Sequence, residues 1–190
     1  RGLECDKLDP AAVERHFRAF PERLIAEAGA HAGKAFRFVL VDSWEAGYQN
    51  WTARLPAEFE KRRGYSLLPW LPALAGEVVG SARESEAALY DFRLTIADLI
   101  RESYYERLAA LLHERKVELH AEVVYGGAGY PPLDVLRSTK DVDLPMTEFW
   151  TSADGDSLLR YAPADAPELS LPACAAAGYG KPLVGSEAYT

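Results

Sequence analysis

Short apolar runs alternate with longer helical patterns along this sequence, and this alternation constrains the fold more than any other feature. Helices are expected at residues 10–30, 56–63, 82–115 and 168–178, strands at 36–42, 116–125, 144–149 and 183–188, and a proline-rich loop at 68–72. The apolar residues recur at helical spacing in the first set and in short, mostly apolar runs in the second. Strands separated by helices pair in parallel through right-handed crossovers. The fold class is therefore α/β.

Two architectures are built from such units: the doubly wound sheet and the (β/α)8 barrel. No glycine-rich phosphate loop follows an expected strand, which argues against the dinucleotide-binding form of the doubly wound sheet. A barrel instead places polar functional residues at the carboxyl ends of several strands. The sequence shows this feature, so we expect residues 1–190 to form part of a (β/α)8 barrel.

Acidic side chains, and one histidine, lie near the carboxyl ends of all four expected strands. They are Asp42, Glu45, His120, Glu122, Glu148 and Glu187. Alternate residues of a strand share a face, so His120 and Glu122 are expected to point the same way. A single acid at a strand end is as often a solvated loop residue as a functional one. Acids at the ends of four strands favour a functional site, beside which Trp44 and Trp150 are candidate platforms for a sugar ring.

The composition excludes several classes of protein. Acidic residues outnumber basic ones by 29 to 21, the formal net charge is −8, and no basic stripe is visible, so a nucleic-acid partner is not expected. No apolar run approaches the length of a membrane span. The two cysteines, Cys5 and Cys174, are expected to be free thiols.

Strand-end carboxylates on a barrel serve two kinds of chemistry. In glycoside hydrolysis, one carboxylic acid protonates the leaving oxygen, and a second carboxylate attacks the sugar or activates water. In a metal-dependent sugar isomerase or aldolase, the same residue types hold a divalent cation. Composition and spacing leave both open.

Several motifs point to one family. These are DSWEAGYQNWT at 42–52, EFEKRRGY at 58–65, ECDKL at 4–8, DFR at 91–93, EFW at 148–150 and GSEAYT at 185–190. Together they resemble the α-L-rhamnosidases of glycoside hydrolase family 106, and the resemblance covers essentially the whole chain. It implies a central slice of a barrel catalytic domain within a larger, multi-domain bacterial enzyme, exported to the periplasm or secreted. An incomplete barrel leaves open strand edges, so the isolated chain is expected to aggregate or to pair with itself.

The resemblance also implies an activity. Members of this family remove terminal α-L-rhamnose from plant glycosides or pectic polysaccharides by an inverting mechanism, and calcium is associated with the sugar site in part of the family. Glu45 matches the general acid and Glu187 the general base, although the opposite assignment is compatible with the residue types. Glu148 matches a carboxylate near the metal or the sugar hydroxyls.

The resemblance implies substrate-binding roles for further residues. Asp42 would tune Glu45 or bind sugar or metal, and His120 and Glu122 would line the same pocket. Two other functions remain open on the sequence: a barrel glycosidase with another sugar specificity, and a carbohydrate-binding relative without catalysis.

Overall fold

The structure is a computed structural model that describes residues 4–44, 46–123, 131–149 and 167–188. Its centre is a parallel sheet of four strands in the order β1-β2-β3-β4. The strands are β1 (Phe38–Val41), β2 (Glu118–Glu122), β3 (Leu144–Phe149) and β4 (Gly185–Ala188). The spatial order follows the chain order without reversal, as in a barrel and unlike a doubly wound sheet. The strands form a curled half-barrel, which confirms the expected fold class.

The strands lie where the sequence predicted them, but three are shorter. Val39 pairs with Leu119, Ala121 with Pro145, and Met146 with Gly185. On the face of the sheet toward α6, Leu119 and Ala121 are fully buried. Strand β2 is therefore covered on this side, as expected for the outer layer of a barrel.

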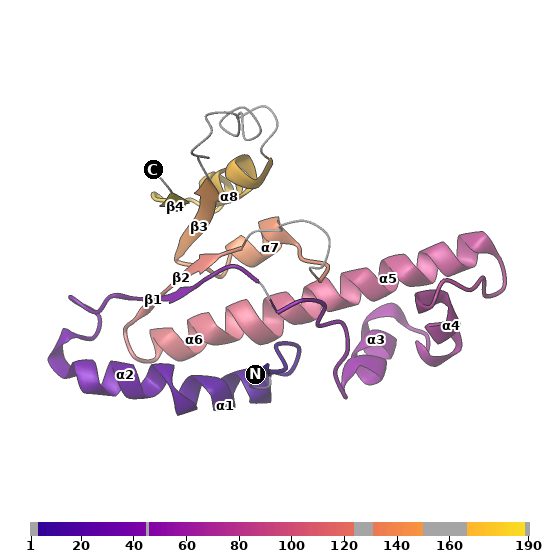
Figure 1. Ribbon diagram of the computed structural model, residues 1–190, viewed down its shortest axis with the longest axis horizontal. Helices are drawn as coiled ribbons and strands as arrows, with labels where there is room; N and C mark the ends of the chain where they lie inside the picture. The colour runs from indigo at the N-terminus through magenta and orange to yellow at the C-terminus, as the bar shows by residue number, and fades with distance from the viewer. Residues whose placement is uncertain (1–3, 45, 124–130, 150–166, 189–190) are drawn as a thin grey trace, which may run out of the picture.

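One long helical rod crosses the molecule beneath the sheet (Figure 1). It consists of α5 (Ala82–Ile100), the π-helix η3 (Arg101–Glu106) and α6 (Arg107–His113). The expected helix at 82–115 is thus confirmed, but its middle turns are wider than α-helical. Ser81 caps the start of the rod by accepting a hydrogen bond from the backbone N–H of Glu84.

The expected helix at 10–30 is two helices, α1 (Pro10–Ala19) and α2 (Pro21–Ala28), followed by the 3-10 turn η1 (Gly29–His31). The break lies at Phe20, whose φ of −134° is not helical, and Pro21 then opens the second helix because it needs no N–H partner. In Figure 1, α1 and α2 run beneath α6.

The remaining helices include three that the sequence did not predict. The expected loop at 68–72 is helical, with η2 (Leu68–Trp70) and α4 (Leu71–Leu74), because each proline stands in a first turn. The short helix α7 (Val135–Thr139) was missed. The other two, α3 (Leu55–Arg63) and α8 (Pro167–Gly178), match their predictions closely.

The core lies between the rod, α1 and the sheet. Its residues are fully or almost fully buried and include Val13, Phe17, Ile96, Leu99, Ile100, Leu111, Leu112, Val117, Leu119 and Val123. Cys5 and Cys174 are free, as expected. Among the described residues, no helix combines the length and the apolar character that a membrane crossing requires.

Candidate active site

Parallel pairing brings the carboxyl ends of the four strands to one edge of the sheet. In register, Leu40 lies beside His120, and His120 beside Leu144. One step further along, Glu122 pairs with Met146. Alternate residues share a face. Asp42, two residues after Leu40, and Glu122, two residues after His120, therefore project into the interior of the half-barrel.

Three carboxylates meet at this edge. One carboxylate oxygen each from Asp42, Glu122 and Glu187 lie within 4.8 Å of one another. Glu122 is 1% exposed, whereas Asp42 is exposed and Glu187 is half-buried. Carboxylates this close repel one another when all are ionised, so the arrangement suits a bound cation. We call these three residues the carboxylate cluster.

The donor atoms of the cluster suit a hard divalent cation. All three are carboxylate oxygens, which are the ligands that calcium prefers. The expected metal ligand Glu148 lies on β3 directly beside Glu187, with which its backbone is in register. The described side chains of the cluster therefore fit the calcium that the family resemblance implies.

His120 lies on the same face as Glu122, two residues earlier. Burial lowers the pKa of its imidazole, which favours the neutral ring. Its Nε2 atom is buried and has no hydrogen-bond partner among the residues that the structure describes. The ring of Phe38 meets it edge to face, with centroids 6.0 Å apart. The predicted sugar contact of His120 remains a prediction.

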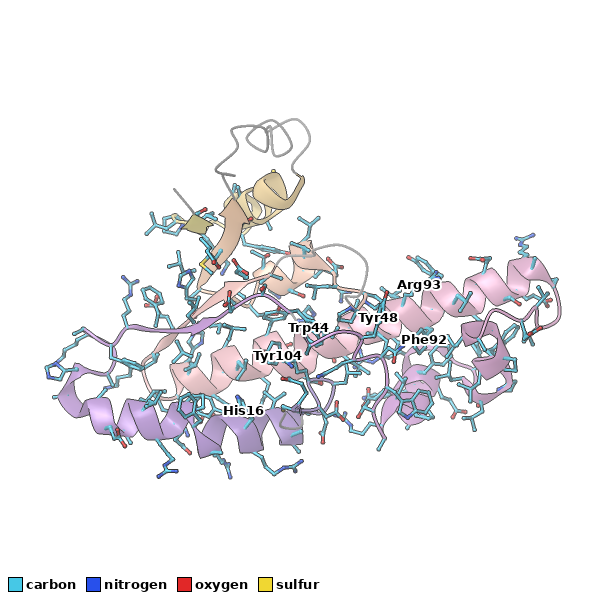
Figure 2. All side chains as sticks on the ribbon, in the orientation of Figure 1. His16, Trp44, Tyr48, Phe92, Arg93 and Tyr104 are labelled. Carbon is cyan, nitrogen blue, oxygen red and sulfur yellow. The ribbon has the colours of Figure 1, made fainter. Side chains whose placement is uncertain are left out.

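Trp44 is packed into the protein. It is 5% exposed, and its indole N–H donates to the carbonyl of Gly47 at 2.9 Å. The ammonium group of Lys7 lies 4.9 Å from the centre of its ring, and Tyr104 meets it edge to face. Figure 2 labels Trp44 and Tyr104. Its predicted role as a sugar platform also remains a prediction.

The remaining predicted residues cannot be placed in the same way. Glu45 and Trp150 lie outside the described residues, and so does the side chain of Glu148. Gln49 and Thr52, a few residues after Glu45, are held by hydrogen bonds to the N-terminal segment. Thr52 donates to Asp6 at 2.8 Å, and the backbone N–H of Lys7 donates to Gln49 at 3.2 Å. These bonds tie the loop after β1 to the segment at residues 4–8.

Sequence reasoning missed the residues that support the site from below. The fully buried Tyr105 donates its hydroxyl to the backbone carbonyl of Glu122 at 3.3 Å. Its neighbour Tyr104 contacts Trp44, so the π-helix directs two consecutive tyrosines toward the sheet. Such π segments are often found at functional sites. The double tyrosine on the buried side of a long helix is the signal that could have indicated them.

Other motif residues have a structural role. Tyr65 donates to Asp91 at 2.9 Å, and Arg63 donates to Asp98 at 2.7 Å. Both bonds fix α3 on α5, so the blocks at 58–65 and 91–93 hold the scaffold together.

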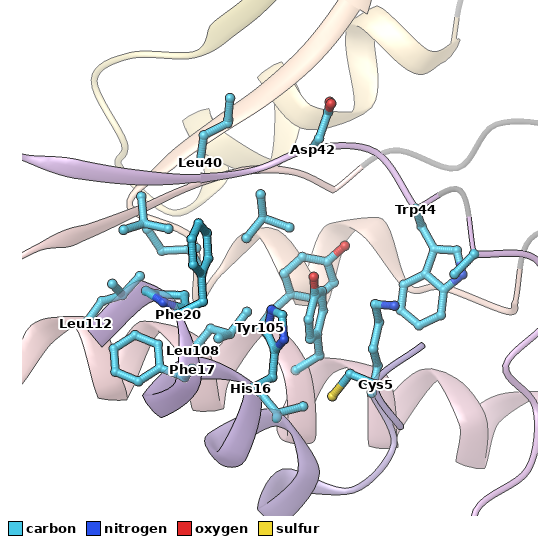
Figure 3. Close-up of a pocket in the computed structure, with 18 of the residues that line it drawn as sticks. Cys5, His16, Phe17, Phe20, Leu40, Asp42, Trp44, Tyr105, Leu108 and Leu112 are labelled. Atoms are coloured by element: carbon cyan, nitrogen blue, oxygen red, sulfur yellow. The ribbon is translucent and has the colours of Figure 1, made fainter. Parts of the chain in front are cut away.

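A groove of about 550 Å³ runs along the open edge of β1, between this strand and α1 (Figure 3). Its apolar lining comes from both elements and from α6, and includes Phe17, Phe20, Val39, Leu108 and Leu112. In Figure 3, the side chains of Leu40 and Asp42 point away from Phe17 and His16. The groove therefore lies mainly on the helix side of the sheet, and Leu40 and Asp42 border it at the strand.

A parallel half-barrel with acidic side chains converging at its strand ends fits two classes of barrel enzyme, glycoside hydrolases and metal-dependent sugar enzymes. Sequence comparison assigns the family: the profile of glycoside hydrolase family 106, described as alpha-L-rhamnosidase, matches residues 1–190. The chain belongs to this family.

Two relatives extend this assignment. The solved structure of a rhamnosidase from Novosphingobium sp. PP1Y matches with a TM-score of 0.81 and 32% identity, over 98% of this chain and 17% of that one. A protein from Formosa agariphila, provisionally named beta-glucuronidase, is 37% identical over 150 residues, which are 79% of this chain and 12% of that protein. The chain thus spans less than one fifth of either relative.

Proposed function

We propose that the protein containing this chain removes terminal α-L-rhamnose from plant glycosides or pectic polysaccharides. Membership of the rhamnosidase family and the rhamnosidase neighbour support a glycoside hydrolase. The observation that carries the proposal is the convergence of Asp42, Glu122 and Glu187 at the carboxyl ends of parallel strands. Catalytic carboxylates of barrel enzymes occupy this place.

The proposed mechanism is inverting. Glu187, on β4, accepts a proton from a water molecule, whose oxygen attacks the anomeric carbon of the sugar. Glu45, in the loop after β1, donates its proton to the glycosidic oxygen as the bond to the aglycone breaks. The released sugar first has the opposite anomeric configuration, and the two carboxyl groups exchange their protonation states until solvent restores them.

Calcium is part of the proposal. Asp42, Glu122 and Glu187 would hold it, with Glu148 beside them. When bound, the ion orients sugar hydroxyls and offsets the mutual repulsion of the carboxylates. Loss of calorimetric calcium binding in Glu122→Gln, with binding retained in Glu118→Gln at an exposed position of the same strand, is the expected result.

The name of one relative suggests a second candidate, a glucuronidase. A glucuronide carries its own carboxylate, which the carboxylate cluster would repel. Rhamnose is a neutral deoxysugar, so the charge of the site favours it. Turnover of p-nitrophenyl α-L-rhamnoside and of p-nitrophenyl β-D-glucuronide by the full-length protein separates the two candidates.

Proton NMR of the first sugar released tests inversion: β-L-rhamnose is expected, and initial α-L-rhamnose would contradict it. Sugar binding without turnover of either substrate would favour the non-catalytic relative.

The rest of a longer chain is the proposed partner of the open edge of β1. The backbone N–H of Glu118 donates to the carbonyl of Arg37 at 2.8 Å, so residues 37, 39 and 41 face β2. Leu40 therefore directs its backbone groups to the open edge, and its side chain is 54% exposed. Glu4 and Cys5 line the same groove. We propose that the residues preceding Arg1 in the full protein enter the groove beside them and pair with β1 as a parallel strand.

The last part of the proposed function concerns where in the cell the protein acts. Enzymes that act on plant glycosides meet their substrates outside the cell, so we propose a periplasmic or secreted protein. Fractionation of the source bacterium, with the protein detected in the periplasm or the medium, is the expected result. Exclusive recovery from the cytoplasmic fraction would contradict it.

A further inference from the structure

His120 occupies the space that a side chain at position 185 would need. A methyl group built on the Cα of Gly185 would lie 2.6 Å from Nε2 of His120 and 3.3 Å from its Cε1. Carbon atoms do not approach a ring this closely in folded proteins, so any side chain at 185 would displace the ring or the strand. The φ angle of Gly185 is not positive, so its backbone conformation would suit other residues as well. The position requires glycine because of the imidazole.

This contact lies one step below the carboxylate cluster on two strands at once. On β2, His120 is two residues before Glu122, and on β4, Gly185 is two residues before Glu187. Alternate residues share a face, so the ring and both carboxylates project to the same side of the sheet. The imidazole thus links β2 to β4 directly below the two acids, and Cγ of Met146 on the intervening strand lies 3.2 Å from the same methyl position at Gly185.

The ring is held from its other side as well. Phe38 of β1 packs against it edge to face. The ring therefore lies between Phe38 of β1 and Gly185 of β4 while belonging to β2. A group packed in this way sets distances between strands, because protein interiors are dense and transmit small displacements.

We propose that His120 is a positioning residue whose ring, seated against Gly185, sets the separation of Glu122 and Glu187. The proposal rests on the proposed function, in which Glu187 activates water. It assigns His120 to the support of the site and removes it from the set of groups that contact the sugar. Catalysis depends steeply on such placement, since a shift of about 1 Å can reduce the rate about 100-fold.

A size exchange between the two positions tests the proposal in the full-length protein. Gly185→Ala adds the methyl group that collides with the ring, and His120→Asn shortens the side chain that it meets. We expect Gly185→Ala to lower kcat by about 100-fold and His120→Asn to lower it less, with KM for p-nitrophenyl α-L-rhamnoside unchanged in both. The double variant should recover to the kcat of His120→Asn alone. Gly178→Ala is the matched control, because nothing lies within 4 Å of its added methyl group, and it should behave as the wild type.

Each outcome decides for or against the proposal. A Gly185→Ala variant as active as Gly178→Ala would overturn it, and so would a double variant with no recovery. If Gly185→Ala gives no folded protein, His120→Asn alone is sufficient: a raised KM with unchanged kcat would show that His120 contacts the sugar. Glu187→Gln belongs in the same set of assays. If it retains wild-type turnover, the proposed function has failed, and the two failures remain distinguishable.

Discussion

The buried carboxylate of Asp98 is predicted to anchor the scaffold beneath the site. It accepts hydrogen bonds from Arg63 of α3 and Arg137 of α7, both at 2.7 Å, and its side chain is 10% exposed. Asp98→Asn would leave Arg63, which is 14% exposed, without its counter-charge. Removal of one partner from a buried ion pair costs about 3–5 kcal/mol. Arg137 is 47% exposed, so its ion pair with Asp98 contributes about 1 kcal/mol or less to stability.

We expect Asp98→Asn to lower the free energy of local unfolding by about 3 kcal/mol. This is the lower end of the range, because Thr95 still accepts a hydrogen bond from Arg63 at 2.9 Å. The assay is amide hydrogen exchange over α3 in the full-length protein, which reports local unfolding. A loss of about 3 kcal/mol accelerates exchange by roughly 100-fold. Glu118→Gln is the control, because its ion pair with Arg37 at 3.1 Å is solvent-exposed and little change is expected. Equal exchange over α3 in the two variants would refute the reasoning.

Two further predictions concern the groove and a buried tyrosine. Phe20→Lys should lower the thermal midpoint of the full-length protein by several degrees, whereas Val78→Lys should not. Both residues are more than half exposed in this chain, but only Phe20 lines the groove that we propose is covered. Equal midpoints would argue against the covering strand. Burial, together with the hydrogen bond to Asp91, raises the pKa of Tyr65 to about 12. An unfolded tyrosine loses its proton near pH 10, so the stability from Tyr65 is complete below that pH and is lost as pH rises to about 12. The absorbance titration of wild type minus Tyr65→Phe should have its midpoint near the higher value, and a midpoint near pH 10 would contradict this.

The sheet could be predicted because its strands depend on local patterns. The apolar run at 36–42 and the alternation around Leu119 and Ala121 are visible in the sequence, and helices between strands require parallel pairing. The two prolines at 69 and 72 led us to predict a loop, whereas both lie in first helical turns. Proline is typical of both environments. The helix α7 has only five residues, which is too short for a helical period to be recognised.

The site was predictable in part for the same reason. Asp42, Glu122 and Glu187 lie together because strand ends of a parallel sheet meet at one edge, and the sequence placed all three at such ends. The environments of Trp44 and His120 could not be predicted. They depend on partners distant in the chain, Tyr104 for the first and Gly185 for the second, and no periodic pattern records such contacts.

The most direct test of the account is hydrolysis of p-nitrophenyl α-L-rhamnoside by the full-length protein, compared with its Glu45→Gln and Glu187→Gln variants. Loss of a general acid or base typically reduces the rate by about 100-fold to 10,000-fold. The account predicts rapid turnover by the wild type and a loss of this size in each variant, with both variants folded as judged by circular dichroism. Turnover that persists in Glu187→Gln, or its absence from a correctly folded wild type, would contradict the central claim.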